Sequence, residues 1–215
     1  MKEIVSVSIL SSDFMELKND LERIKKSGAE MLHFDVMDGI FVDNISFGFP
    51  ILEKVNKNSD MTLDVHLMIE SPYKYIERCA SFGADIITFH IESEGDPDKT
   101  IDAIKKTGAK AGLALRPGTP LEKALPFMNK IDMLLIMTVE PGFGGQAFMN
   151  DMLEKIKDAR KFITENGLDT DIQVDGGINA STAALASDAG ANILVAGSYI
   201  FKSEDMKNAV DSLRR

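Results

Sequence analysis

The chain has 215 residues, of which 44% are hydrophobic and 27% charged, which is enough for one well-buried domain over residues 1–215. Its 24 basic and 34 acidic side chains leave a net charge of −10 without a basic run, which argues against nucleic acid or an anionic membrane surface as a partner. The single cysteine, Cys79, excludes an internal disulfide, and no apolar run suits a signal peptide or a membrane span, so we expect a cytoplasmic protein.

Short apolar runs rich in β-branched residues alternate with helical patterns along the chain. We expect strands at residues 4–10, 31–36, 62–67, 86–90, 110–115, 133–138, 172–175 and 193–196. Strands buried on both faces with helices between them predict an α/β protein with a closed (β/α)8 TIM barrel in a single domain. An open doubly wound sheet is the alternative. Polar residues end most of the strands, which favours a barrel because closure brings all these ends to one face.

Capping residues and glycines indicate where the helices begin and end. Asp13 is expected to cap a helix that spans residues 13–27. An apolar stripe at helical spacing predicts this helix, and it consists of Phe14, Leu17, Leu21 and Ile24. A capping residue followed by proline predicts three further helix starts, at Ser71-Pro72, Asp96-Pro97 and Thr119-Pro120. Glycines in the left-handed conformation are expected to end four helices, at Gly28, Gly83, Gly108 and Gly190.

Imidazole and carboxylate side chains stand at the ends of three predicted strands. In the run MLHFDVMDG, residues 31–39, alternation puts His33 and Asp35 on the same face of the strand. The run TLDVHLM places His66 at the end of the next strand, and IQVDGG places Asp175 at the end of the seventh. Two imidazoles and two carboxylates form a ligand set for a borderline divalent metal ion such as Zn, Fe or Mn.

Glycine-rich loops follow the last three predicted strands. The segment MTVEPGFGGQ contains Gly142, Gly144 and Gly145, whose backbone N–H groups are candidates for binding an anion, unless the loop serves as a lid. Gly176-Gly177 follows the seventh strand and Gly197-Ser198 the eighth. The loops after strands seven and eight are the usual phosphate site of this barrel, so we expect a phosphate group to bind there.

Motifs throughout the chain resemble those of the ribulose-phosphate 3-epimerase family. They are SVSILSSDF, HFDVMDG, DVHLM, ITFH, GLALRPGTP, VEPGFGGQ, VDGGI and VAGS. The resemblance implies a TIM barrel that binds a divalent metal ion and interconverts D-ribulose 5-phosphate and D-xylulose 5-phosphate in the pentose phosphate pathway. The family's DGHFVPN segment reads DGIFVDN here, with Ile40 and Asp43 at the differing places.

The same resemblance implies roles for individual residues. The implied metal ligands are His33, Asp35, His66 and Asp175, around one ion per chain. The implied substrate contacts are Ser8, His66, Gly142, Phe143, Gly144, Gly145, Asp175, Gly176, Gly177, Gly197 and Ser198. Related barrels assemble as dimers or hexamers, so a homo-oligomer is expected. Zn, Fe(II), Mn and Co suit the ligand set equally.

Epimerisation beside a ketone requires a proton to leave one face of a carbon and another to arrive on the opposite face. Two acid/base groups on opposite sides of an enediolate can do this, and Asp35 and Asp175 are the candidates for catalytic residues. A metal ion would stabilise the developing oxyanion. The methionines Met37, Met68 and Met137 end strand motifs and are candidates for an apolar rim that excludes water, or for simple core filling.

Other polar residues are interpreted as structural. His90 is expected to be a satisfied core histidine, and structural roles are expected for three carboxylates, those of Asp38, Asp64 and Asp132. Ser8 has a second interpretation as part of the barrel floor, and Cys79 is assigned no role.

Three other functions remain open at this stage. The same site could serve a D-allulose-6-phosphate 3-epimerase, and GFGGQ with VDGGI favours the pentulose enzyme over it. A non-catalytic sugar-phosphate-binding barrel would keep the glycine loops and lose a carboxylate, whereas both carboxylates are present. A metal-dependent aldolase would need only one base, and no lysine at a strand end suits a Schiff base.

Overall fold

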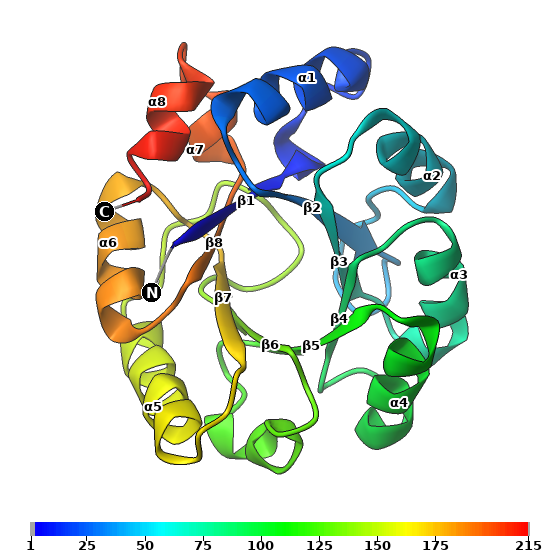
Figure 1. Ribbon diagram of the computed structural model, residues 1–215, viewed down its shortest axis with the longest axis vertical. Coiled ribbons are helices and arrows are strands. Elements are labelled where there is room, and N and C mark those ends of the chain that lie inside the picture. Colours follow the sequence, from blue (N-terminus) through cyan, green and yellow to red (C-terminus); the bar gives the residue numbers. More distant parts are fainter. Residues whose placement is uncertain (1–2, 215) are drawn as a thin grey trace.

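A computed structural model describes residues 3–214, which form a closed barrel of eight parallel strands in sequence order (Figure 1). Neighbouring strands pair in parallel, and β8 pairs with β1 through the register Ile4↔Ile193 to Val7↔Ala196. That last pairing closes the sheet and excludes the open doubly wound alternative. The predicted (β/α)8 TIM barrel is therefore confirmed.

The strands agree closely with the predicted runs. They are β1 Ile4–Ser8, β2 Met31–Met37, β3 Thr62–Met68, β4 Ile86–His90, β5 Lys110–Leu115, β6 Met133–Met137, β7 Asp171–Asp175 and β8 Ile193–Ala196. The prediction for the first strand was too long, because the chain turns into the 3₁₀ segment η1 Ile9–Ser11 after the last pairing of β1, Ser8↔His33.

Helices pack around the outside of the barrel (Figure 1). They are α1 Leu17–Ser27, α2 Phe49–Asn58, α3 Ile76–Ser81, α4 Pro97–Thr107, α5 Met152–Glu165, α6 Ala180–Ala189, α7 Ser198–Phe201 and α8 Met206–Asp211. Gly28 and Gly108 end α1 and α4 at φ values of 83° and 89°, in the left-handed region where glycine avoids the strain of a Cβ.

Only one of the predicted capping side chains caps an α-helix as expected. Asp96 accepts a hydrogen bond from the N–H of Asp98 at the start of α4. Asp13 does not cap α1, which begins four residues later at Leu17, and Ser71 precedes the 3₁₀ segment η2 Pro72–Tyr75 without a capping hydrogen bond from its side chain.

The prediction of an α-helix after Thr119 is wrong. That stretch forms two short 3₁₀ segments, η3 Leu121–Lys123 and η4 Leu125–Phe127. Pro126 lies inside η4, and a proline there has no N–H for an α-helical hydrogen bond and clashes with the carbonyl one turn earlier. The cap-plus-proline signal marked a turn, but the second proline prevented it from continuing as a helix.

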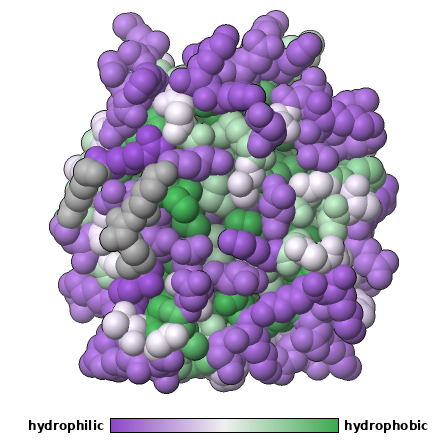
Figure 2. Space-filling view, viewed as in Figure 1, coloured by the Kyte–Doolittle hydropathy of each residue, from purple (hydrophilic) through white to green (hydrophobic). Residues whose placement is uncertain are grey.

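Alternate residues of each strand face the helices or the barrel interior. Leu32 and Phe34 of β2 belong to the core between the barrel and its helices, whereas His33 and Asp35 lie on the other face. Figure 2 shows that hydrophilic side chains cover most of the outer surface on the face seen in Figure 1. The pattern matches the alternation expected from the sequence.

A layer of apolar side chains closes the amino-terminal end of the barrel interior. Met31, Ile86, Met133 and Ile193 form this layer, with Ile4 packed against it. Ser8 is the last residue of β1 and lies toward the opposite, carboxyl-terminal end, so its interpretation as part of the floor is wrong. Within residues 3–214, no helix combines the length and the apolar character needed to cross a membrane.

Candidate active site and metal centre

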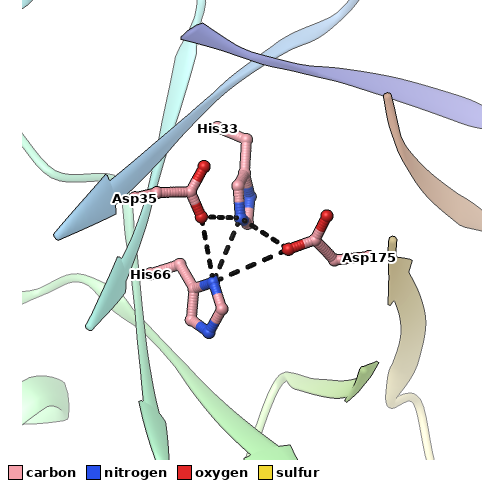
Figure 3. A group of neighbouring side chains, drawn as sticks. All are labelled: His33, Asp35, His66 and Asp175. Carbon is pink, nitrogen blue, oxygen red and sulfur yellow. Dashed lines mark hydrogen bonds and ion pairs between the residues drawn. The ribbon is translucent and has the colours of Figure 1, made fainter. Parts of the chain in front are cut away.

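Four side chains from β2, β3 and β7 converge at the carboxyl-terminal end of the barrel (Figure 3). Asp35 Oδ1 lies 3.1 Å from His33 Nε2 and 3.2 Å from His66 Nδ1, and those two nitrogens are 3.3 Å apart. Asp175 Oδ2 is 3.7 Å from His33 Nε2 and 3.8 Å from His66 Nδ1. The tertiary fold thus brings together the four residues implied as metal ligands, and we name them the His/Asp cluster.

The spacing and chemistry of the His/Asp cluster fit a divalent metal ion. All four ligand atoms lie within 4.8 Å of one another. Bonds of about 2.0–2.1 Å to a tetrahedral ion place the donor atoms about 3.3 Å apart, close to the separations found here. Two imidazole nitrogens and two carboxylate oxygens suit a borderline divalent ion. The cluster could therefore hold a metal ion in this position.

The charged groups of the His/Asp cluster perturb one another strongly. Burial opposes protonation of His33, but the adjacent carboxylates of Asp35 and Asp64 raise its pKa well above 6.5. Burial also opposes ionisation of Asp35, yet His33 and hydrogen bonds from both histidines lower its pKa far below 3.8. Burial raises the pKa of Asp175 to about 6; attraction to His33 opposes this shift and repulsion from Asp35 adds to it.

The two carboxylates are therefore separated in acidity although they share one site. Paired carboxyl groups whose pKa values are driven apart are the usual arrangement for a base and an acid acting together. Ser8 Oγ donates a 2.7 Å hydrogen bond to Asp35 Oδ2, so the two oxygens of Asp35 have different partners. This bond fixes the orientation of the Asp35 carboxylate.

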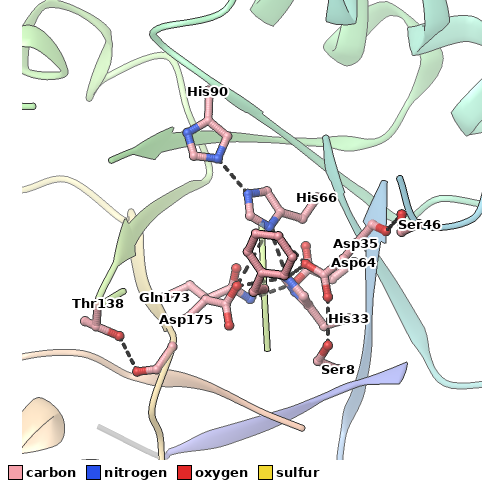
Figure 4. A network of polar contacts seen from close by, with 12 residues as sticks. Ser8, His33, Asp35, Ser46, Asp64, His66, His90, Thr138, Gln173 and Asp175 are labelled. Atoms are coloured by element: carbon pink, nitrogen blue, oxygen red, sulfur yellow. Dashed lines mark hydrogen bonds and ion pairs between the residues drawn. The ribbon is translucent and has the colours of Figure 1, made fainter. Parts of the chain in front are cut away.

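Asp64 and Gln173 lie next to the His/Asp cluster inside the barrel (Figure 4). Asp64 Oδ2 is 2.7 Å from His33 Nδ1 and accepts a 2.6 Å hydrogen bond from Gln173 Nε2. Asp64 is fully buried, as is Gln173. Sequence reasoning set Asp64 aside as structural, although alternation put it on the same face as His66, two residues further along β3.

His90 extends the polar network away from the cluster (Figure 4). Its Nε2 lies 2.9 Å from His66 Nε2, and its Nδ1 lies 3.1 Å from Glu92 Oε2. Burial lowers the pKa of His90 to about 4. His90 is a satisfied buried histidine as expected, but its contact with His66 connects it to the site. Sequence reasoning missed Glu92, whose position just beyond β4 was the only available signal.

The other carboxylates interpreted as structural are confirmed in that role. Asp38 accepts hydrogen bonds from the N–H groups of Ile40, Phe41 and Glu70 and so shapes the loop after β2. Asp132 Oδ2 accepts a 2.8 Å hydrogen bond from the N–H of Ala111 at the start of β5.

A cavity of about 650 Å³ opens above the His/Asp cluster. Most of the predicted site residues line it: Ser8, Asp35, Met37, Met68, Met137, Gly142, Phe143, Gly144, Gly145, Asp175, Gly176, Gly177, Gly197 and Ser198. His33 and His66 are fully buried and lie beneath it. The three methionines are also buried, so they both fill the upper barrel and contribute to the cavity wall.

The glycine loops after β6, β7 and β8 meet on one side of this cavity. Within 4 Å, and among the residues that the structure describes beyond its chain neighbours, a Cβ built on Gly144 or Gly145 would find only Ser198 Oγ, at 3.9 Å and 3.7 Å. Among residues 3–214, no acceptor receives a hydrogen bond from the backbone N–H of Gly144 or Gly145. Gly177 is constrained instead, because a Cβ there would lie 2.3 Å from the backbone N of Phe148. The loop after β6 thus offers unbonded N–H donors beside the cavity.

The loop after β2 reaches the loop after β6. Asn44 Nδ2 donates a 2.7 Å hydrogen bond to the carbonyl of Gly142. Ile40 and Asp43, which differ from the family's pattern, are exposed and do not line the cavity. Those differences leave the His/Asp cluster and the glycine loops unchanged.

Comparison with known proteins identifies the family. The family described as "Ribulose-phosphate 3 epimerase family" matches residues 4–201. A ribulose-phosphate 3-epimerase of Bacillus subtilis (strain 168) is 46% identical over 98% of this chain and 97% of its own length. The chain belongs to the ribulose-phosphate 3-epimerase family. This confirms the resemblance in the sequence motifs and makes the protein an isomerase of the epimerase type.

Other members of the epimerase family come from distant organisms. The cytoplasmic isoform of Oryza sativa subsp. japonica is 43% identical over 98% of this chain and 92% of its own length. The protein of Methanocaldococcus jannaschii is 44% identical over 98% of this chain and 89% of its own length.

Solved structures share the barrel of the epimerase at low sequence identity. KGPDC from Streptococcus mutans has a TM-score of 0.75 at 13% identity, covering 99% of this chain and 96% of its own. 3-Hexulose-6-phosphate synthase from Salmonella typhimurium has a TM-score of 0.74 at 15% identity, covering 99% and 96%. Similarity at this level supports the TIM barrel alone.

Proposed function

We propose that this epimerase interconverts D-ribulose 5-phosphate and D-xylulose 5-phosphate, using Asp35 and Asp175 as acid/base groups beside one divalent metal ion. The observation that carries the proposal is the position of these two carboxylates, which share the His/Asp cluster and line the same cavity. The names of the relatives give a ribulose phosphate as substrate and carbon 3 as the epimerised centre, and D-xylulose is the 3-epimer of D-ribulose. We place the reaction in the pentose phosphate pathway and in the cytoplasm.

The chemistry follows from the different environments of the two carboxylates. Asp35, whose pKa is lowered, is the base that takes the C3 proton of ribulose 5-phosphate. Asp175, whose pKa is raised to about 6, delivers a proton to the opposite face of the enediolate. The roles exchange in the reverse direction. Ser8 keeps Asp35 oriented through its hydrogen bond to Oδ2.

A divalent ion held by His33, Asp35, His66 and Asp175 would supply a Lewis acid for the negative charge that develops on the substrate oxygen. Zn, Fe(II), Mn and Co all suit this donor set, and the proposal does not depend on which is used. The buried methionines Met37, Met68 and Met137 keep water away from the enediolate without offering a proton.

The phosphate of the substrate binds at the glycine loops in this proposal. The free N–H groups of Gly144 and Gly145 are the main donors, with the backbone at Gly177 and Gly197 and the hydroxyl of Ser198 beside them. The chain carries a net charge of −10, so binding of a phosphate dianion requires such local donors. We also expect the epimerase to work as a homo-oligomer.

Assays of purified protein with two substrates test the function. We expect rapid epimerisation of D-ribulose 5-phosphate, much slower turnover of D-allulose 6-phosphate, and loss of activity when a chelator removes the metal ion. An Asp132→Asn variant, altered far from the cavity, is the control and keeps its activity. Faster turnover of the hexulose phosphate, or full activity in metal-free protein, would refute the proposal as stated.

A further inference from the structure

The two histidines of the His/Asp cluster present different ring nitrogens to the same point. His33 faces Asp35 Oδ1 with Nε2, and His66 faces it with Nδ1. The other nitrogen of each ring is also engaged, by Asp64 on one side and by His90 on the other (Figure 4). Each neutral imidazole carries one N–H and one lone pair, so these outer contacts decide which nitrogen is free to bind a metal ion.

On the His33 side, the outer contact is a buried carboxylate. Asp64 Oδ2 lies 2.7 Å from His33 Nδ1 and is held from the other direction by Gln173 Nε2 at 2.6 Å. Asp64 Oδ2 already acts as an acceptor toward Gln173, and an accepting oxygen at this distance from the ring needs an N–H on Nδ1 of His33. The lone pair of a neutral His33 is then on Nε2, which is the nitrogen facing the cluster.

On the His66 side, two contacts in series have the same effect. Glu92 Oε2 lies 3.1 Å from His90 Nδ1, and a carboxylate there requires an N–H on that nitrogen. His90 is fully buried, which favours a neutral ring with a lone pair on Nε2. His66 Nε2, 2.9 Å away, must then be the donor in the bond between the two rings. In the absence of a metal ion His66 Nδ1 is a donor to Asp35 Oδ1, 3.2 Å away. Once an ion binds in the cluster, the outer contact keeps the N–H of a neutral His66 on Nε2 and leaves its lone pair on Nδ1, facing the ion.

We propose that Asp64 and the His90–Glu92 pair are positioning residues that hold His33 and His66 in opposite tautomers, so that Nε2 of one and Nδ1 of the other bind the same metal ion. The assignment rests on the metal-dependent function proposed above and extends it to residues outside the ligand set. A carboxylate that orients a ligand histidine in this way commonly changes metal affinity by 10- to 100-fold when it is removed.

Glu92, the outermost residue of the His66–His90–Glu92 series, is itself held in place by the loop after β5. Glu92 Oε1 accepts a 3.0 Å hydrogen bond from the N–H of Arg116. Lys155 Nζ holds the same loop by donating to the carbonyls of Arg116, Pro117 and Thr119 at 3.2, 2.7 and 2.8 Å. Glu92 therefore has a defined place even though it lies on a loop, and it can orient His90 in turn.

Imidazole ¹⁵N NMR of the protein loaded with Zn²⁺ alone tests the tautomers directly. The chain has three histidines, all in this network, so each signal can be assigned by single substitutions. We expect protonated Nδ1 and zinc-bound Nε2 in His33, and protonated Nε2 and zinc-bound Nδ1 in His66. In His90 we expect a protonated Nδ1 and an unprotonated Nε2 that accepts the hydrogen bond from His66. Protonation of His90 on Nε2, or zinc on Nε2 of His66, would overturn the proposal.

Metal affinity, measured by competition with a chelator, tests the same residues by substitution. Asp64→Leu and His90→Leu should each weaken Zn²⁺ binding by about 10- to 100-fold. Asp64→Asn should bind Zn²⁺ almost as tightly as the wild type. The asparagine oxygen can take the place of Oδ2 and accept the hydrogen bond from His33, and its NH₂ group can take the place of Oδ1, which has no hydrogen-bond partner. Asp132→Leu, the same change at a carboxylate far from the cluster, is the control.

Folded Asp64→Leu and His90→Leu variants that bind Zn²⁺ as tightly as the wild type would also overturn the proposal. If these variants do not fold, the NMR pattern of the wild type decides. The readouts do not depend on turnover, so the two proposals can fail separately. A protein with the expected tautomers and no epimerase activity refutes the proposed function, and an active enzyme with another pattern refutes the positioning role.

Discussion

Asp35 and Asp175 face the same two imidazoles but differ in their surroundings. The side chain of Asp35 is 4% exposed and is held by Ser8 and both histidines, whereas that of Asp175 is 19% exposed at the cavity wall. The more enclosed carboxylate has the lower pKa because its charged partners outweigh the cost of burial. Individual residue environments thus give two identical functional groups opposite pKa shifts, as the proposed roles of base and acid require.

Replacing either carboxylate by asparagine should therefore stop epimerisation. We expect Asp35→Asn and Asp175→Asn each to lower kcat by at least about 100-fold, the usual scale for general acid/base catalysis. In deuterated water, Asp175→Asn should still exchange the C3 hydrogen of ribulose 5-phosphate without forming xylulose 5-phosphate. NMR of the sugar measures both reactions in one sample.

Both residues are also proposed metal ligands, so the metal content of each variant must be measured alongside its rate. Asp132→Asn, the same change at a carboxylate that does not line the cavity, provides the control. A metal-loaded Asp175→Asn enzyme that epimerises at the wild-type rate would show that the two-carboxylate mechanism is wrong.

Cys79 is a residue-scale test of packing. Burial raises the pKa of its thiol to about 12, so the thiol is protonated throughout the neutral range and is not nucleophilic. We expect no reaction with a thiol reagent at pH 8 in the native protein and one reactive thiol per chain in denaturant. Rapid labelling of the native protein would contradict the burial of this side chain in the core around α3.

At the scale of elements, the loops after the strands differ in how much change they tolerate. A Cβ at Gly177 would clash with backbone, whereas one at Gly144 would make only an ordinary contact, 3.9 Å from Ser198 Oγ, and the φ of Gly144 is one that other residues adopt. A side chain at Gly144 would therefore project toward the proposed phosphate site without forcing the fold to move. This makes Gly144 the best place to test the loop after β6.

We expect Gly144→Leu to raise KM for ribulose 5-phosphate by about 10- to 100-fold. The leucine side chain would occupy the phosphate position and keep the phosphate from the backbone N–H groups, and a hydrogen bond to a charged group contributes about 1.5–3 kcal/mol. The variant should keep its metal ion, since Gly144 does not belong to the His/Asp cluster. Gly118→Leu, in another exposed turn with open space around it, is the control. Steady-state kinetics with an unchanged KM would remove this loop from the site.

The helix starts provide a second test at the element scale. Asp96 caps α4 with a 3.0 Å hydrogen bond from the N–H of Asp98, whereas Ser71 makes no capping bond to η2. We expect Asp96→Ala to lower the free energy of unfolding by about 1 kcal/mol and Ser71→Ala to change it little. Urea denaturation measures both. Equal effects would contradict this difference in capping.

At the scale of the whole molecule, the His/Asp cluster joins strands that are distant in sequence. It links β2 and β3 to β7 across the barrel. Anything that binds the native state in preference to the unfolded chain stabilises the fold, so a metal ion here should act as a cross-link between the two halves of the sheet.

We expect free Zn²⁺ at 100 times its Kd to add about 2.7 kcal/mol to the free energy of unfolding, and to raise Tm by about 5–10 °C. The effect should fade as pH falls below about 6, because protonation of Asp175, with its pKa raised to about 6, competes with the metal ion. In the metal-free protein, Asp175 has the opposite effect on stability. Its pKa is higher in the folded state than in the unfolded chain, so the free energy of unfolding falls as pH rises from the unfolded pKa of 3.8 through about 6.

Calorimetry between pH 5 and pH 8, with and without Zn²⁺, measures both effects. A Tm gain that does not change with pH would contradict the assignment of Asp175 as a ligand. Asp132→Asn should follow the wild-type curve in this experiment, because that carboxylate anchors β5 and does not reach the cluster.

The sequence alone determined the local features of this protein. Strand alternation predicted that His33 and Asp35 share a face, and the runs between glycines and caps predicted eight βα units. Motifs along the whole chain identified the family. These features could be predicted because a two-residue period and a tight turn depend on neighbouring residues only.

Only the tertiary structure decided which distant residues meet. Barrel closure brings Gln173 of β7 to Asp64 of β3 and places His90 against His66. No local pattern distinguishes these residues from ordinary buried polar groups, because their partners are set by register around the closed sheet. The stretch after Thr119 shows a second way in which a local signal is insufficient. Its capping residue and proline predicted the start of a helix, but Pro126 further along the chain prevented the helix from continuing, and two short 3₁₀ segments formed instead.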